Sequence, residues 1–101
     1  MKKSEFAYIS GSPIHGKGLF ASHRINRNTH IGTFEGKSTK RDGTYVLWIY
    51  DDDDSLTGRR GTNNLRYLNH GKTPNAEFDG FELYAIKMIR KDDEIVIDYG
   101  W

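Results

Sequence analysis

Most residues of this chain that could take part in chemistry lie in three short segments. Gly16-Lys17-Gly18 places a lysine between two glycines near the start of the chain. Segment 66–75 reads RYLNHGKTPN and puts an amide beside an imidazole at Asn69-His70. Segment 93–101 reads DEIVIDYGW and carries a phenol at Tyr99. Glycines permit positive φ and a close approach of the backbone to a ligand, but each pattern alone is a weak indication of a site.

Taken together, the three segments resemble the motifs of SET-domain protein lysine methyltransferases. The family pattern is GxG, then RFxNHSCxPN, then GEELxxDY. The three matches occur in family order and span residues 16–101, and the first one extends through Leu19-Phe20-Ala21. The resemblance implies an enzyme that uses S-adenosylmethionine to methylate a lysine in a basic protein or histone-like tail.

The implied reaction is an in-line displacement in which the lysine amine must be neutral. The cofactor carries the reactive methyl, and the protein supplies orientation and electrostatics, without a metal. A narrow channel lined by apolar and aromatic residues would lower the pKa of the lysine by desolvation. The aromatic residues available for such a channel are Tyr45, Trp48, Tyr50, Tyr67, Phe78, Tyr84, Tyr99 and Trp101.

The resemblance assigns roles to individual residues. Tyr99 matches the catalytic tyrosine, whose hydroxyl would lie near the transferring methyl and help to align amine and sulfonium. Asn69 should bind the amino-acid portion of S-adenosylmethionine. His70 should contribute backbone contacts to the adenine and side-chain bonds that hold the C-terminal segment. Gly16-Lys17-Gly18 would form the loop whose backbone wraps the cofactor.

Arg66 and Trp101 complete the expected cofactor site. Arg66 matches the arginine that opens the central motif, with an ion pair to Glu94 or Asp98 as the alternative role. Glu94 matches the acid of the last motif and is expected to be structural. Trp101 could cover the adenine or the lysine channel.

The expected substrate channel is formed by Tyr45, Phe78 and Ile97, with simple core packing as the alternative for Phe78 and Ile97. Two positions depart from the family pattern, because Gly71-Lys72 stands where the family has Ser-Cys. Lys72 would either lie close to the cofactor or face water.

Short strands separated by glycine turns are expected to position these residues. Asp79-Gly80 between two such strands predicts a tight hairpin, because the turn needs positive φ. Helix is limited to one short turn within 61–68, with Thr62 or Asn63 as its cap. Runs rich in β-branched and aromatic residues predict strands at 6–9, 18–21, 30–34, 44–50, 76–78, 81–86 and 94–97.

The expected fold class is therefore mostly β, with little helix. The resemblance implies the SET fold (a β-clip), which packs several small curved sheets around a C-terminal pseudoknot. In that pseudoknot the C-terminal segment would bring residues 98–100 against Asn69-His70. We expect one SET domain over residues 1–101 without Cys-rich zinc modules, since the chain has no cysteine and can form neither disulfides nor Cys-ligated zinc sites.

Charge and hydropathy indicate the expected partners. The net charge of +1 does not argue for nucleic acid, and no apolar stretch is long enough to span a bilayer. The start of the chain lacks the apolar run of a signal peptide. Asp51–Asp54 is expected to be a solvated loop, or else a field that attracts a basic peptide. His15, His23 and His30 have no metal-like spacing and are expected on the surface or in loops.

The expected partners are a lysine-containing protein, possibly histone-like, and a second copy of the chain. We expect a homodimer, as in other minimal stand-alone SET proteins, because the sequence ends at Trp101 without a segment to cover the site. The expected location is the cytoplasm for a bacterial protein, or the host nucleus for a viral or eukaryotic one.

Two other functions remain open at this point. One is a non-catalytic SET-like module that binds a basic peptide, which Gly71-Lys72 favours. The other is a small β-rich nucleic-acid binder that uses Arg59, Arg60, Arg66 and Lys72. The latter predicts affinity that falls steeply with salt, and the near-neutral net charge argues against it.

Overall fold

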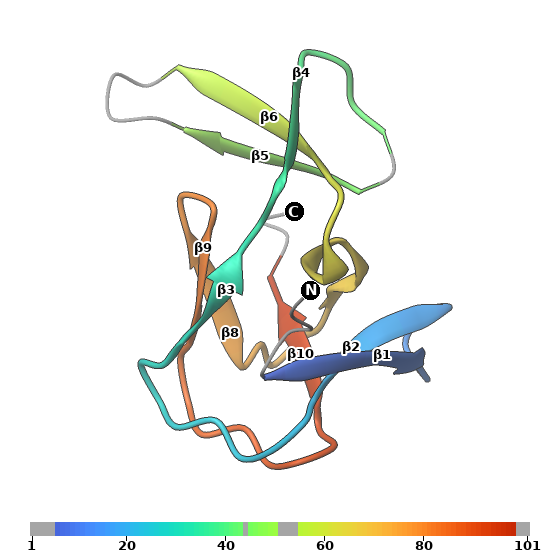
Figure 1. Ribbon diagram of the computed structural model, residues 1–101, viewed down its shortest axis with the longest axis vertical. Coiled ribbons are helices and arrows are strands. Elements are labelled where there is room, and N and C mark those ends of the chain that lie inside the picture. Colours follow the sequence, from blue (N-terminus) through green and yellow to red (C-terminus); the bar gives the residue numbers. More distant parts are fainter. Residues whose placement is uncertain (1–5, 44, 51–54, 99–101) are drawn as a thin grey trace.

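The computed structural model describes residues 6–43, 45–50 and 55–98, which form three small sheets (Figure 1). One 3₁₀ turn, η1 (Asn64–Tyr67), lies between β6 and β7. No helix in the described ranges is long and apolar enough to cross a membrane. The strands are β1 (Ala7–Gly11), β2 (Lys17–Ala21), β3 (His30–Thr33), β4 (Gly36–Thr39), β5 (Val46–Tyr50), β6 (Leu56–Gly61), β7 (Asn69–His70), β8 (Ala76–Asp79), β9 (Glu82–Ala85) and β10 (Glu94–Ile97).

The first sheet has the strand order β1-β2-β10-β7 and contains the predicted pseudoknot. β10, red in Figure 1, pairs antiparallel with β2 and parallel with β7, where Val96 lies beside Asn69 and Ile97 beside His70. The Asn75 side chain then bonds to the β10 backbone, donating to Glu94 O and accepting from Val96 N, both at 2.9 Å. The central motif thus wraps around the last strand, as the resemblance implied. The strand pairing falls on residues 96 and 97, Asp98 lies 3.7 Å from His70, and residues 99 and 100 of the expected contact lie outside the described residues.

The second sheet, β3-β9-β8, contains the predicted hairpin. Asp79 pairs with Glu82, so the two residues at the turn are Gly80 and Phe81. Gly80 has φ +62°, and a glycine at the first central position is the arrangement that type II′ hairpin turns favour. The hairpin is confirmed, with Asp79 inside the strand rather than in the turn.

The third sheet, β4-β6-β5, was predicted only in part. The strand expected at 44–50 is β5, with its first residue, Thr44, outside the described residues. The other two strands of this sheet, β4 and β6, were not predicted, because GKST and LTGRRG lack the β-branched and aromatic runs that signal strands. The acidic block 51–54, between β5 and β6 in the sequence, also lies outside the described residues.

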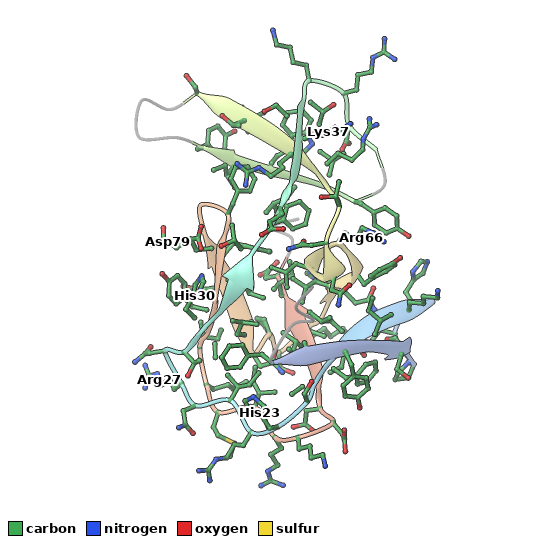
Figure 2. The ribbon with its side chains drawn as sticks, viewed as in Figure 1. His23, Arg27, His30, Lys37, Arg66 and Asp79 are labelled. Carbon is green, nitrogen blue, oxygen red and sulfur yellow. The ribbon has the colours of Figure 1, made fainter. Side chains whose placement is uncertain are left out.

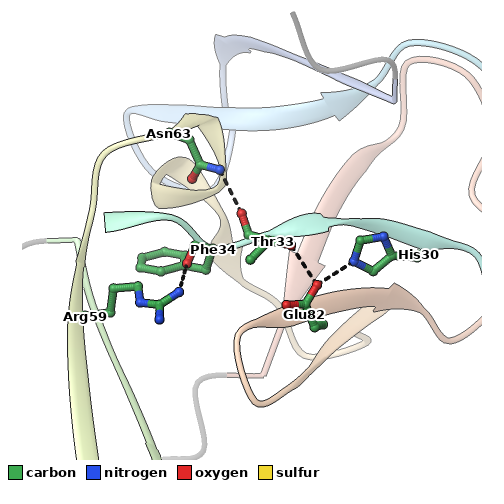
Figure 3. Close-up of polar contacts among 6 residues, drawn as sticks. All are labelled: His30, Thr33, Phe34, Arg59, Asn63 and Glu82. Carbon is green, nitrogen blue, oxygen red and sulfur yellow. Dashed lines mark hydrogen bonds and ion pairs between the residues drawn. The ribbon is translucent and has the colours of Figure 1, made fainter. Parts of the chain in front are cut away.

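Side-chain bonds tie β3 to the elements around it (Figure 3). Asn63 occupies the N-cap position of η1, but its side chain makes no cap bond; instead its Nδ2 donates to Thr33 O at 2.8 Å. Arg59 on β6 donates to Phe34 O at 2.8 Å. These bonds hold η1 and the third sheet against the second sheet.

The hydrophobic core lies mainly within the first two sheets. Leu19, Leu83 and Ile95, on three central strands, are fully buried, and each such side chain contributes about 1.5–3 kcal/mol relative to an exposed one. Residues 36–43, 45–50 and 55–61 contribute none of the buried hydrophobic residues. The third sheet, at the top of Figure 1, therefore lies at the edge of the core, against which the half-buried Leu47 of β5 packs. The remaining core residues are Ala7, Ala21, Ile25, Ile31, Phe34, Leu65, Leu68, Ala76, Ala85, Ile89 and Ile97.

Candidate functional site

A cleft of about 1270 Å³ gathers residues from all three sheets. It is lined by the loop that joins β1 to β2, by β5 and η1, and by parts of β7, β8 and β10. Gly18 does not line it, while Tyr99 and Trp101 lie outside the described residues. The sequence-predicted site residues that line it are Gly16, Lys17, Tyr45, Arg66, Asn69, His70, Phe78 and Ile97.

Asn69 holds the glycine loop against the last strand. Its side chain is buried in the first sheet, with 8% exposed. The Asn69 Nδ2 lies 3.2 Å from His15 O, 3.1 Å from Lys17 O and 2.9 Å from the Glu94 carboxylate. His15, expected as a surface or loop residue, is part of the cleft wall. One amide group therefore organises the loop that the sequence assigned to cofactor binding.

The two glycines of this motif are needed for different physical reasons, and only Gly16 lies in the loop, because β2 begins at Lys17. Gly16 has φ +46°, a conformation that side chains disfavour. Gly18 packs directly on Glu94, so that an added Cβ would collide with the Glu94 carboxylate. That carboxylate also accepts a 2.8 Å bond from the Ser12 hydroxyl. Glu94 is thus a structural residue beneath the loop, as expected.

Arg66, a residue of η1, lines the cleft (Figure 2) and does not form the alternative ion pair. Its guanidinium donates to Thr62 O and Asn63 O, both at 2.9 Å, and stacks 4.5 Å from the centre of the Tyr67 ring. No carboxylate of the described residues forms an ion pair with Arg66. The predicted alternative was wrong because the carbonyl oxygens of the 3₁₀ turn take up its donors.

Tyr45 enters the cleft from a strained backbone position. Its φ is +68°, which is uncommon for a bulky residue and is typically found at functional sites. The Tyr45 carbonyl accepts a 2.8 Å bond from Gly61 N, and its ring packs edge-on against Tyr67 with 5.5 Å between centroids. The residue remains 45% exposed, so its ring is available to a ligand.

The apolar side of the cleft is formed by Phe78 and Ile97. Phe78 packs edge-on against Phe34, with centroids 5.9 Å apart, and Ile97 is 5% exposed. Both residues line the cleft and also pack in or against the core, so the core packing foreseen as the alternative is confirmed, and the channel role stays a prediction. Trp48 and Tyr67 add aromatic surface, whereas Tyr50 and Tyr84 lie outside this cleft.

His70 and Asp98 close the cleft near the last strand, with 3.7 Å between Nδ1 and Oδ1. The next residue, Gly71, donates its N–H to Ile97 O at 3.0 Å. A Cβ at Gly71 would come within 2.9 Å of Val96 Cγ2, so glycine here allows the chain to pack closely on β10. Lys72 is exposed and does not line the cleft.

The groups in this cleft suit a ligand with both charges and a flat ring. Lys17 and Arg66 can meet a carboxylate, and Asp98 can meet an ammonium group. Tyr45, Tyr67 and Trp48 offer aromatic faces. The described residues contain no group of three His, Asp or Glu side chains arranged for a metal ion.

Asp42 is a residue of the cleft that the sequence analysis did not assign. Its only signal was position, since Asp42-Gly43 precedes the most β-prone run of the chain. That dipeptide indicates a turn and gives no sign that the carboxylate faces a cleft.

Comparison with known proteins gives a consistent match. The family model named SET domain matches residues 16–100. The histone-lysine N-methyltransferase MEDEA of Arabidopsis thaliana is 24% identical over 111 positions, covering 90% of this chain and 16% of that protein. An H3 lysine-4 specific histone-lysine N-methyltransferase of Aspergillus oryzae is 24% identical over 120 positions, covering 97% of this chain and 10% of that protein. The chain thus spans a small part of these relatives.

Solved structures show the same fold. The methyltransferase domain of human histone-lysine N-methyltransferase SETMAR superposes with a TM-score of 0.81 at 22% identity, covering 94% of this chain and 45% of that one. CpSET8 from Cryptosporidium superposes with a TM-score of 0.76 at 16% identity, covering 94% of this chain and 57% of that one. At these identities the likeness establishes the fold alone.

Proposed function

This chain belongs to the SET-domain family, and from that premise we propose that it is an S-adenosylmethionine-dependent protein-lysine N-methyltransferase. The observation that supports this most directly is the cleft, which gathers every described residue assigned to the site except Gly18. Six of those residues, Gly16, Lys17, Arg66, Asn69, His70 and Ile97, come from three separated motifs, so their meeting in one cleft is an independent argument.

The cofactor would be held by the glycine loop, Arg66, Asn69 and His70. When bound, S-adenosylmethionine supplies an activated methyl group on a sulfonium. Lys17 and Arg66 offer cations for its carboxylate, and the backbone around Gly16 can approach it closely. Asn69 keeps this loop in place through its bonds to two loop carbonyls. The residues present therefore fit this cofactor.

The target lysine would enter along Tyr45, Phe78 and Ile97. These side chains form an aromatic and apolar wall in the same cleft. Removing water from the lysine ammonium disfavours its charged form, which lowers its pKa and supplies the neutral amine. Tyr99, placed by the last motif, would align this amine through its hydroxyl.

The substrate that we propose is a lysine in a basic protein or histone-like tail. The curated relatives named above are histone-lysine methyltransferases, which supports this class of substrate. The alternative is a SET-like module that binds a basic peptide without turnover.

Calorimetric titration of S-adenosylmethionine into the purified protein is the decisive experiment. We expect saturable binding that is lost in Asn69→Ala and retained in Tyr99→Phe, while methyl transfer to a panel of basic peptides is lost in both. Circular dichroism must show that Asn69→Ala is folded, because Asn69 also bonds to Glu94.

Two outcomes would contradict the proposal. Absence of binding at millimolar cofactor would argue against a cofactor site in this chain. Peptide binding without turnover that depends on Tyr99 would favour the non-catalytic module.

A further inference from the structure

Asp42 carries a fixed, ionised carboxylate into the cleft. It lies in the connection between β4 and β5, and its Oδ1 accepts bonds from Gly43 N at 2.9 Å and from Trp48 Nε1 at 3.1 Å. The indole N–H of Trp48, followed by the Gly43 N–H, lowers the pKa of Asp42. Both bonds fall on one oxygen, and no described residue bonds to Oδ2.

Trp48 is held beside Asp42 by the third sheet. It pairs in register with Gly58 on β6, and a Cβ at Gly58 would come within 2.6 Å of the Trp48 ring. The ring therefore packs against the backbone of β6, while its remaining surface lines the cleft. Its N–H bond to Asp42 fixes the carboxylate and the ring relative to each other.

This pair has the chemistry of a cation-binding subsite. A carboxylate bonds strongly to guanidinium or ammonium groups, and a tryptophan face attracts the same groups. No lysine, arginine or histidine of residues 6–43, 45–50 and 55–98 forms an ion pair with Asp42. Asp42 lines the same cleft as Tyr45, Phe78 and Ile97, where we placed the target lysine.

We propose that Asp42 and Trp48 bind a second cationic side chain of the substrate, an arginine or lysine close to the target lysine. This inference rests on the proposed function and adds a sequence preference to it. The Asp42 carboxylate would recognise this cation by its charge, and the Trp48 indole by direct contact. Both contacts would lie outside the channel that binds the target lysine.

Asp42→Asn tests the proposal cleanly, because an asparagine Oδ1 can still accept both bonds while the charge is removed. The substrates are peptides with one target lysine and one arginine, moved in turn through the positions on either side of the lysine. Each has a partner in which neutral citrulline replaces the arginine. At the preferred position, we expect Asp42→Asn to lower kcat/KM about 10-fold for the arginine peptide, as for one charge-assisted hydrogen bond. The citrulline peptide should be unaffected.

Asp92→Asn is the matched control. Asp92 is exposed, accepts one 2.7 Å bond from the Tyr8 hydroxyl, and does not line the cleft. Asp92→Asn removes the same charge from the protein and should leave kcat/KM unchanged for both the arginine and the citrulline peptide. An equal effect of both variants would mean that only the overall charge acts, and would overturn the subsite.

A binding measurement separates this proposal from the proposed activity. Fluorescence anisotropy with the target lysine replaced by methionine needs no turnover, and there too Asp42→Asn should weaken the arginine peptide alone. Failure of the activity would appear as no turnover of any peptide by the parent protein. The subsite would be overturned if the parent protein bound the arginine and citrulline peptides equally. It would also be overturned if Asp42→Asn weakened only the binding of the cofactor.

Discussion

At the scale of single residues, the Glu94 carboxylate supports the glycine motif through direct contacts. It accepts bonds from Ser12 and Asn69, and Gly18 lies directly against it. The loop, the central motif and the last strand therefore meet at one charged group. A change at any of these positions should disturb the others through Glu94.

Gly18→Ala should destabilise the protein and weaken cofactor binding. The new Cβ would collide with the Glu94 carboxylate, and overpacking of this kind costs about 1–3 kcal/mol. Urea unfolding measures the first effect and calorimetric titration of S-adenosylmethionine the second. Gly11→Ala, on the neighbouring strand β1, is the control, because a Cβ there meets nothing within 4 Å. Equal stability of the two variants would contradict this account of Gly18.

At the scale of elements, β10 depends on the segment that wraps around it. β2 pairs with one edge of β10 and β7 with the other, and Asn75 continues the bonding beyond β7. The Asn75 amide satisfies one carbonyl and one N–H of the β10 backbone. These two groups are shielded from water by the wrap, so their bonds should matter for stability.

Asn75→Ala should therefore lower the free energy of unfolding. Each partly buried backbone group left unsatisfied costs about 1–3 kcal/mol. Urea unfolding at neutral pH is the measurement. Asn26→Ala, at an exposed position, should stay within about 0.5 kcal/mol of the parent. A similarly small effect of Asn75→Ala would show that the wrap holds β10 without this side chain.

The junction between β3 and β9 should make stability depend on acid pH. The pKa of Glu82 is lowered, first by the Thr33 hydroxyl and then by His30, which lies 2.7 Å away. A carboxylate with a lowered pKa in the folded state stabilises the protein above its unfolded value of 4.5, and this contribution is lost as pH falls through the folded value. The effect should be small because both side chains of the pair are more than 40% exposed.

Glu82→Gln should accordingly flatten the acid side of the stability curve. Thermal unfolding measured from neutral pH to below pH 4.5 would show a smaller loss of Tm in the variant than in the parent. Identical slopes would mean that the lowered pKa of Glu82 contributes nothing to stability.

At the scale of the whole molecule, the third sheet contributes little to the core, and its strand β5 forms one wall of the cleft. The first two sheets share the buried residues, and the third sheet is joined to them by contacts such as that of Arg59 with Phe34 O and, at 3.8 Å, with the Phe81 ring. The cleft of about 1270 Å³ exceeds the roughly 300–1,000 Å³ of ordinary ligand sites. It has room for both a cofactor and a substrate side chain.

We propose that a second copy of the chain covers part of this cleft, giving a homodimer. Covering would exclude water from the site, which strengthens electrostatic interactions within it. Analytical ultracentrifugation across a concentration series should give the dimer mass. A monomer with full methyl-transfer activity at every concentration would contradict the proposal.

The sequence alone determined the local features of this protein. The strands with β-branched and aromatic residues, such as β5, were predicted, as was the hairpin at Gly80 with its positive φ. The three motifs also supplied six of the residues that line the cleft, Gly16, Lys17, Arg66, Asn69, His70 and Ile97. The site assignments beyond this shared location stay predictions, and those for Tyr99 and Trp101 fall outside the described residues.

Only the tertiary structure decided the features that depend on distant contacts. β6 forms because it pairs with β5 on one side and β4 on the other, and β4 forms because it pairs with β6, although the residues of β4 and β6 favour no strand. The bonds of Arg66 to Thr62 O and Asn63 O and of Asp42 to Trp48 are local, within six residues, but no motif indicated them. The bonds of Asn69 to His15 O, Lys17 O and Glu94 join segments that lie far apart in the sequence. The strand propensity of a segment depends on its own residues. Contacts between distant segments depend on how the sheets pack, and no single segment of the sequence determines that packing.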